Sequence, residues 1–166
     1  MPSKTLPPKP RSIAAKKTIS IVASLYNEDL VNSLLDSTVH GLRTLIPGIT
    51  VNIYRVPGAF EIPVCVKKLI ESNNVDVMIA LGVIIKGETS HAELVGSSVT
   101  QSLQEIATNF NTPIIHEVLL TETREQAIER CYGDKNRGKE AAKAAATMSE
   151  LFSSLDAANK RNPNLS

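Results

Sequence analysis

The chain has 166 residues, 42% of them hydrophobic and 21% charged, and its formal net charge is +1. These values indicate a soluble globular protein and give no strong field that would attract nucleic acid or an anionic membrane. No apolar run approaches the roughly 18 residues that a transmembrane helix needs. The cysteines and histidines are too scattered for a disulfide framework or a metal site, so we expect a cytoplasmic protein without metal; they are Cys65, Cys131, His40, His91 and His116.

Residues 1–17 differ in composition from the rest of the chain. They hold four prolines and five basic residues but no acidic residue. This composition predicts a disordered, basic, proline-rich tail. A targeting peptide would also lack acidic residues, but this segment is broken by proline and has no apolar core of the kind that a secretory signal requires. We therefore expect a single folded domain over residues 18–166.

Strands and helices are expected to alternate along that domain. Short apolar runs rich in β-branched residues predict strands, and apolar stripes with helical spacing predict helices. In chain order the patterns predict strand 18–25, helix 28–46, strand 50–56, helix 61–73, strand 76–85, helix 90–107, strand 114–119, helix 123–130 and helix 138–155.

This order predicts an α/β fold, a three-layer αβα sandwich with a four-stranded parallel sheet that is flavodoxin-like. Ligands of such folds bind beyond the carboxyl ends of the strands. Functional residues are therefore expected in the segments that directly follow strands.

The sequence GVIIKGET follows the central predicted strand and resembles a P-loop in its glycine spacing. Glu88 stands where a P-loop has its lysine, and a carboxylate there would repel a triphosphate. Gly87, Thr89 and the start of the next helix would instead suit a single phosphate monoester. The structural alternative is that Gly87 only turns the chain and that Ser90 and Glu93 form a capping box. Both interpretations can hold together.

Further candidates follow the same logic. His91 lies in the first turn of that helix, where a neutral imidazole could transfer protons, although a lone histidine is more often structural. Glu61 could accept hydrogen bonds from polyol hydroxyls, or could simply favour the helix dipole. Tyr26 could stack on a flat ring, or Tyr26 and Asn27 could simply form an ordinary Asx-type helix start. Arg130 could bind an anion, or could complement a helix C-terminus.

These segments together resemble the lumazine synthase family over about residues 18–155. The specific pieces are VPGAFEIP (56–63), ALGVIIKGETSH (80–91), EQAIER (125–130) and NRG (136–138). The resemblance implies condensation of 5-amino-6-(D-ribitylamino)uracil with 3,4-dihydroxy-2-butanone 4-phosphate. The products would be 6,7-dimethyl-8-ribityllumazine, phosphate and water, formed in riboflavin biosynthesis without a cofactor.

The resemblance also implies roles for individual residues. His91 would be the catalytic acid/base, and Arg130 would reach the phosphate from an adjacent subunit. The remaining substrate-binding positions would be Tyr26, Asn27, Gly58, Ala59, Phe60, Glu61, Val83, Ile84, Ile85, Gly87, Glu88, Thr89, His116 and Arg137. Three of them depart from the family pattern: Tyr26 and His116 stand where phenylalanine is usual, and Arg137 stands where lysine is common.

A site shared between subunits implies a homo-oligomer, and family analogy suggests a pentamer or a pentamer-based shell, with riboflavin synthase as a partner to consider. The short loop before the last helix favours a shell, whereas Pro7, Pro8 and Pro10 oppose the added N-terminal strand that a shell uses. Two other functions stay open: a flavin- or lumazine-binding module without catalysis, and a structural cage. Retention of Gly87, Thr89, His91 and Arg130 argues against the module, and in this family a shell and catalysis coexist.

Overall fold

A computed structural model describes residues 16–72, 74–87 and 89–162 of the chain. Most of the predicted tail, residues 1–17, lies outside these described residues, so its character and the domain boundary at residue 18 stay predictions. No helix in the described part of the chain is both long enough and apolar enough to cross a membrane.

The elements alternate as the sequence predicts, with boundaries that shift by a few residues. In chain order they are β1 (Thr18–Ser24), α1 (Glu28–Leu45), β2 (Thr50–Val56), the 3₁₀ turn η1 (Ala59–Glu61), α2 (Ile62–Ser72), β3 (Val77–Ile85), α3 (His91–Phe110), β4 (Ile114–Thr121), α4 (Arg124–Cys131), the 3₁₀ turn η2 (Gly133–Lys135) and α5 (Arg137–Arg161).

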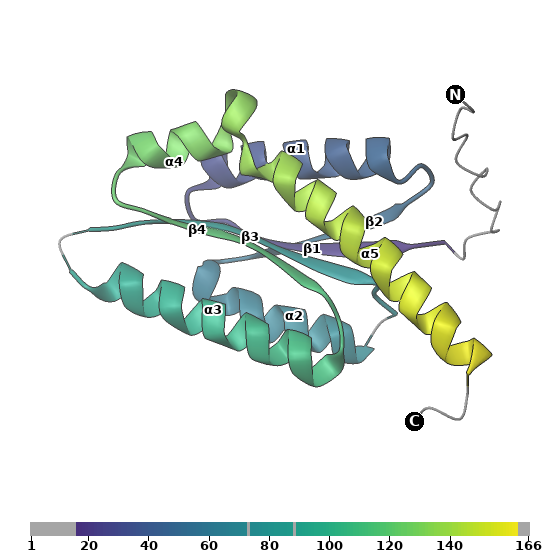
Figure 1. Cartoon of the computed structure of the whole chain (residues 1–166). Coiled ribbons are helices and arrows are strands. Elements are labelled where there is room, and N and C mark those ends of the chain that lie inside the picture. Colours follow the sequence, from purple (N-terminus) through teal and green to yellow (C-terminus); the bar gives the residue numbers. More distant parts are fainter. Residues whose placement is uncertain (1–15, 73, 88, 163–166) are drawn as a thin grey trace, which may run out of the picture.

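The four strands form one parallel sheet in the order β2-β1-β3-β4. Helices α1, α4 and α5 cover one face of this sheet, and α2 and α3 cover the other (Figure 1). The predicted three-layer α/β sandwich with a flavodoxin-like parallel sheet is therefore confirmed. The sheet is buried on both faces, which explains why β3 reads as one continuous apolar run.

The two faces of the sheet carry separate cores. One core joins β1 and β3 to the α1 stripe that includes Leu30, Leu34 and Leu42. The other joins the opposite side chains of the same strands to α2 and α3, including Val66 and Leu103. Side chains alternate between the faces of a strand, so each inner strand supplies both cores.

Helix α5 runs further than its apolar stripe. The prediction ended it at residue 155, but the helix continues to Arg161 with exposed residues in its last turns. The apolar periodicity stops where the helix leaves the sheet, and a helix that no longer packs gives no periodic signal.

Small residues allow α5 to cross α1 closely. An added Cβ at Gly41 would lie 2.7 Å from the Cβ of Ala142. An added Cβ at Gly138 would press on the backbone carbonyl oxygen of Leu34 and would lie 2.9 Å from the Cβ of Ser37. Backbone cannot move aside as a flexible side chain can, so this crossing requires glycine at position 138.

Gly138→Ala should therefore lower the free energy of unfolding by about 1–3 kcal/mol, the usual cost of overpacking. Denaturant unfolding at matched protein concentration measures the change. Gly96→Ala in α3 is the control, because its Cβ would lie 3.4 Å from Leu120 Cδ2, an ordinary contact. Alanine in a helix interior is favoured over glycine by roughly 0.5–1 kcal/mol, so this variant should not be destabilised. Equal losses in the two variants would contradict the crossing argument.

Candidate functional site

The topology of the sheet opens a crevice at the carboxyl ends of β1 and β3. These strands are neighbours, but the chain leaves β1 towards α1 on one face and leaves β3 towards α3 on the other (Figure 1). Such a switch point is where open α/β sheets bind ligands. A pocket of about 460 Å³ lies here, which is the size range of small-molecule sites.

This pocket brings together most of the residues that the sequence singles out. Its lining consists of Tyr26, Asn27, Gly58, Ala59, Phe60, Glu61, Val83, Ile84, Ile85, Gly87, Thr89, His91, Ala92 and Val95. Sequence reasoning missed Ala92 and Val95 as lining residues. Val95 lies one helical turn after His91, so its helical spacing was the available signal. Glu88 lies outside the described residues, and His116, Arg130 and Arg137 do not line the pocket.

Asn27 locks the turn after β1 against the end of β3. Its backbone is left-handed, with φ 55° and ψ 48°, and its Nδ2 donates a hydrogen bond to the Val83 carbonyl oxygen at 2.8 Å. Asn27 is the N-cap residue of α1, but its side chain makes no cap hydrogen bond, so the interpretation as an Asx-type helix start is wrong. One step earlier, Tyr26 N–H donates to the Pro57 carbonyl oxygen, and the Tyr26 side chain is 74% exposed at the pocket mouth.

Glu61 is held within its own turn. The Gly58 N–H donates to Glu61 Oε2 at 2.9 Å, while the Glu61 N–H donates to the Gly58 carbonyl oxygen at 3.2 Å. The reciprocal bonds fix the carboxylate at the pocket wall, and its Oε1 makes no hydrogen bond to another described residue. A ligand hydroxyl could donate to that oxygen.

The end of β3 offers backbone groups to a ligand. Pairing between β1 and β3 ends at Ala23 and Leu81, but β3 continues to Ile85. Beyond Leu81 the β1 side of this strand therefore has no strand partner, apart from the hydrogen bond of Asn27 to Val83. Planar heterocycles with alternating donors and acceptors fit such an edge.

Gly87 lies where the chain leaves β3 for α3. Its φ is not in the left-handed region, and an added Cβ would meet nothing within 4 Å. The turn alone therefore does not require glycine, which favours the interpretation that Gly87 leaves room for a ligand.

The start of α3 differs from the predicted capping box. Ser90 is the N-cap residue but makes no side-chain cap hydrogen bond, and the Glu93 carboxylate contacts Lys86 instead. The capping-box prediction is therefore wrong, because a lysine outside the helix competes for the carboxylate. His91, the first residue of α3, is exposed at the pocket. The first backbone N–H groups of the helix have no intrahelical acceptor and favour an anion.

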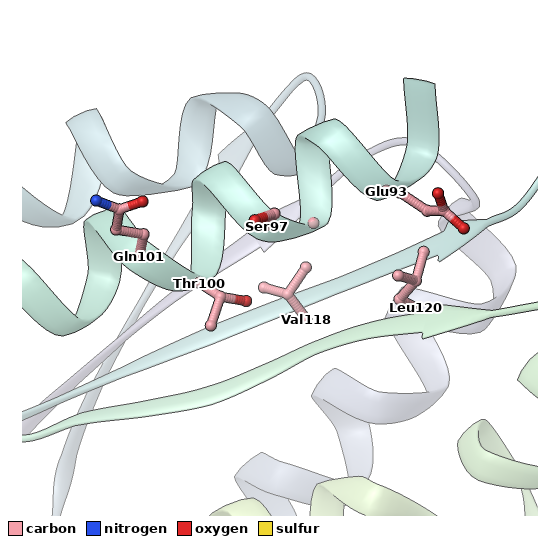
Figure 2. A pocket seen from close by; sticks show the side chains of 7 residues that line it. Glu93, Ser97, Thr100, Gln101, Val118 and Leu120 are labelled. Atoms are coloured by element: carbon pink, nitrogen blue, oxygen red, sulfur yellow. The ribbon is translucent and has the colours of Figure 1, made fainter. Parts of the chain in front are cut away.

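His116 faces a different part of the surface. It lies on β4 with its Nε2 2.8 Å from Thr100 Oγ1 of α3, beside a groove lined also by Leu103, Gln104 and Ile114. A neighbouring hollow of about 450 Å³ continues between α3 and β4 (Figure 2). Glu93, Ser97 and Thr100 of α3 line one side of this hollow, and Val118 and Leu120 of β4 line the other.

Arg130 and Arg137 are also outside the pocket. Arg130 is exposed in the last turn of α4. Arg137 begins α5 and pairs with two carboxylates: its Nε lies 3.3 Å from Glu117 Oε2 and its Nη1 lies 2.6 Å from Glu140 Oε2. Glu117 lies on β4 next to His116, and its side chain is only 8% exposed.

Charge in the pocket is unbalanced for a phosphate ligand. Among the described lining residues Glu61 is the one carboxylate, and neither lysine nor arginine is present. No group of three or more His, Cys, Asp and Glu side chains in the described ranges could hold a metal ion. The pocket thus supplies a ring-stacking face, backbone groups, a carboxylate, helix N–H groups and an imidazole, but no cation of its own.

Fold and pocket define this chain as an α/β protein with a pocket at its switch point, and comparison with known proteins gives the family. The family model described as 6,7-dimethyl-8-ribityllumazine synthase matches residues 16–153. Proteins of that name from Burkholderia mallei (strain SAVP1) and Burkholderia pseudomallei (strain 668) are 46% identical over 139 residues, covering 83% of this chain and 79% of theirs. One from Burkholderia multivorans is 43% identical over the same lengths. The chain belongs to the 6,7-dimethyl-8-ribityllumazine synthase family.

Burial gives Glu117 a measurable pH signature. Desolvation raises the pKa of Glu117, and the charge and hydrogen bond of Arg137 only partly oppose it. Below about pH 4, under the unfolded-state pKa of a glutamate, both states hold the proton. As the pH rises through the raised folded-state pKa, the free energy of unfolding of the wild type falls. Glu117→Gln has no carboxyl at this position and does not show this fall. The free energy of unfolding of Glu117→Gln minus that of the wild type should therefore grow between pH 4 and pH 8. Denaturant titrations across this range measure the difference, and a constant difference would contradict the assignment.

Proposed function

We propose that this chain condenses 5-amino-6-(D-ribitylamino)uracil with 3,4-dihydroxy-2-butanone 4-phosphate to 6,7-dimethyl-8-ribityllumazine, as a transferase of riboflavin biosynthesis. The observation that carries the proposal is the pocket at the switch point. The chain belongs to the family, and its pocket brings together a carboxylate, an open backbone edge, helix N–H groups and a histidine.

The pocket suggests where each substrate binds. Tyr26 stacks on the pyrimidine ring, and the backbone of Val83–Ile85, together with Asn27, meets its polar edge. Glu61 and the Gly58–Phe60 backbone hold the ribityl hydroxyls. The phosphate lies at Gly87, Glu88 and Thr89, where the N–H groups at the start of α3 favour an anion. His91 then lies between the phosphate end and the reacting atoms.

The reaction is a sequence of proton transfers and eliminations. The 5-amino group attacks the ketone carbon, and one water leaves as the imine forms. Loss of a proton from the adjacent carbon expels phosphate, and the resulting enol tautomerises to a carbonyl. The ribityl-bearing nitrogen attacks that carbonyl, and a second water leaves as the ring closes. His91 can accept and return protons in these steps because an imidazole has one ring nitrogen that can accept a proton and one that can donate it.

Alignment is the larger contribution to rate in this proposal. Holding two reactants in a productive geometry is worth roughly 7–11 kcal/mol in favourable intramolecular reactions. A single acid/base group adds about 10²–10⁴-fold. His91 is therefore helpful rather than indispensable.

The missing cation supports a site shared between subunits. A phosphate dianion in a pocket that also holds the Glu61 carboxylate needs positive charge, and no described lining residue supplies it. We assign that charge to Arg130 of an adjacent copy, with His116 and Arg137 in the same half of the site. Arg130 is exposed and therefore accessible to a neighbour. Large apolar side chains near the pocket favour association as well: Phe60, Val64 and Leu94 are 62%, 68% and 66% exposed.

By family analogy the oligomer is a pentamer or a pentamer-based shell, and riboflavin synthase is the proposed partner in a larger assembly. We further propose a cytoplasmic location, which both unpaired cysteines favour. Residues 1–17 are proposed to be a disordered tail outside a single domain of residues 18–166.

The His91→Ala variant should turn over the two substrates about 10–10³-fold more slowly, because one proton-transfer group is lost. Fluorescence of the lumazine product, measured against the wild-type protein, gives the rate. Pyrimidine binding, followed by calorimetry, should stay nearly unchanged. If the wild-type protein binds the pyrimidine but forms no product, the chain is a binding module and not an enzyme. Complete loss of activity in a folded His91→Ala oligomer would contradict alignment as the main source of rate.

Mixed oligomers test the shared site. The variants Glu61→Ala and Arg130→Ala should each be nearly inactive, because each spoils every site. When they are dissociated, mixed in equal amounts and reassembled, about one interface in four should pair two intact halves by simple counting for a cyclic oligomer. Activity should then exceed that of either parent reassembled alone. If mass spectrometry shows mixed oligomers and activity does not recover, the site lies within one chain and Arg130 is wrongly assigned.

A further inference from the structure

Lys86 is tied to three elements at the carboxyl edge of the sheet. It directly follows β3, and its N–H donates to the Thr121 carbonyl oxygen of β4 at 2.8 Å. Its Nζ lies 2.8 Å from Glu93 Oε1 in the first turn of α3 and 2.7 Å from Glu122 Oε1 just after β4. Lys86 does not line the pocket at the switch point.

These two contacts bracket the segment that carries the proposed phosphate site. The Lys86–Glu93 pair spans the residues between β3 and the first turn of α3, and Thr89 and His91 lie within that span. The Lys86–Glu122 pair joins the same point to the turn that begins α4, the helix that carries Arg130. One ammonium group therefore links the end of β3, the first turn of α3 and the turn after β4.

We infer that Lys86 is a positioning residue, which holds Thr89, His91 and the start of α3 where a phosphate ester and its reacting carbon can meet them. This inference rests on the proposed function of the pocket. Lys86 acts on the substrate through the backbone and through Glu93, and it does not contact the substrate itself.

The local charge argues against direct phosphate binding by Lys86. Its single positive charge faces two carboxylates, so the cluster is net negative. Hydrogen bonds to Glu122 and Glu93 raise the pKa of Lys86, and Lys86 lowers the pKa of Glu93, so Lys86 and Glu93 are both charged at neutral pH. A phosphate dianion could reach the ammonium only by displacing a carboxylate.

The two roles of a lysine predict opposite effects of removing its partners. If Lys86 bound phosphate directly, Glu93→Gln and Glu122→Gln would free its charge and strengthen phosphate binding. If Lys86 positions the segment, the same changes loosen it and weaken phosphate binding. The sign of the change therefore separates the two roles.

The experiment uses the assembled protein with inorganic phosphate as the probe in calorimetry, and both substrates in the fluorescence assay. Lys86→Met should raise the phosphate Kd and the KM for the phosphorylated ketone about tenfold, below the roughly 100-fold that a misplacement of about 1 Å can cost. The KM for the pyrimidine should change less than about twofold. Glu93→Gln and Glu122→Gln should each weaken phosphate binding, and Lys86→Arg should restore most of the wild-type affinity because it keeps both ion pairs.

Lys67→Met is the matched control. Lys67 forms an exposed pair with Glu71 in α2, with its Nζ 3.5 Å from Glu71 Oε1, so this variant also loses one lysine from one ion pair. Exposed ion pairs contribute little to stability, so thermal unfolding and particle mass should be unchanged in both lysine variants. Only Lys86→Met should then change the phosphate Kd.

Three results would overturn the positioning role. They are tighter phosphate binding in Glu93→Gln or Glu122→Gln, equal increases in both KM values for Lys86→Met, and wild-type phosphate affinity in Lys86→Met. Phosphate binding that follows the expected pattern in a protein that forms no lumazine would support the role of Lys86 and would reject the proposed function. A wild-type protein that binds no phosphate would reject both.

Discussion

The site depends on the adjacency of β1 and β3, from which the chain departs to opposite faces of the sheet. Because α1 and α3 diverge, the carboxyl ends of these two strands cannot be covered by their own connections, and a crevice results (Figure 1). Because β1–β3 pairing ends at Leu81, the backbone groups of the last residues of β3 have no strand partner on the β1 side. The fold thus creates both the cavity and its backbone hydrogen-bonding edge before any side chain is considered.

The crevice needs local bonds that hold its walls, and these come from polar side chains at strand ends. Asn27 ties the β1 turn to Val83, the Gly58–Glu61 pair closes the β2 turn on itself, and Lys86 ties the β3 end to its neighbours. The Asn27–Val83 and Gly58–Glu61 bonds join residues of the pocket lining, whereas the ion pairs of Lys86 lie outside it. These bonds suit an enzyme that works mainly by alignment, because geometry is then set before substrates arrive.

Sequence patterns predicted the fold and most of the pocket because both depend on order along the chain. Apolar periodicity marked the elements, and parallel topology placed the residues after the strands at one edge. Contacts between distant segments gave no such signal. The Glu93 side chain fits a capping box in sequence, but Lys86 reaches it in space. Asn27 has the residue type of a helix start, yet its side chain serves β3. Glu117 on β4 is buried where it pairs with Arg137 of α5, and nothing in the sequence indicates this contact.

The charge of the pocket connects catalysis with assembly. A cation placed beside Glu61 in the isolated chain would pair with that carboxylate and block the hydroxyls that the carboxylate is proposed to hold. Under the proposed function, Arg130 of another copy would supply the cation and avoid this, because the charge would arrive only when the site is complete. The charge of Lys86 is already balanced by Glu93 and Glu122 outside the pocket. Under the proposed function, the phosphate is then recognised by helix N–H groups from one subunit and by a guanidinium from the next, and neither half binds it strongly alone.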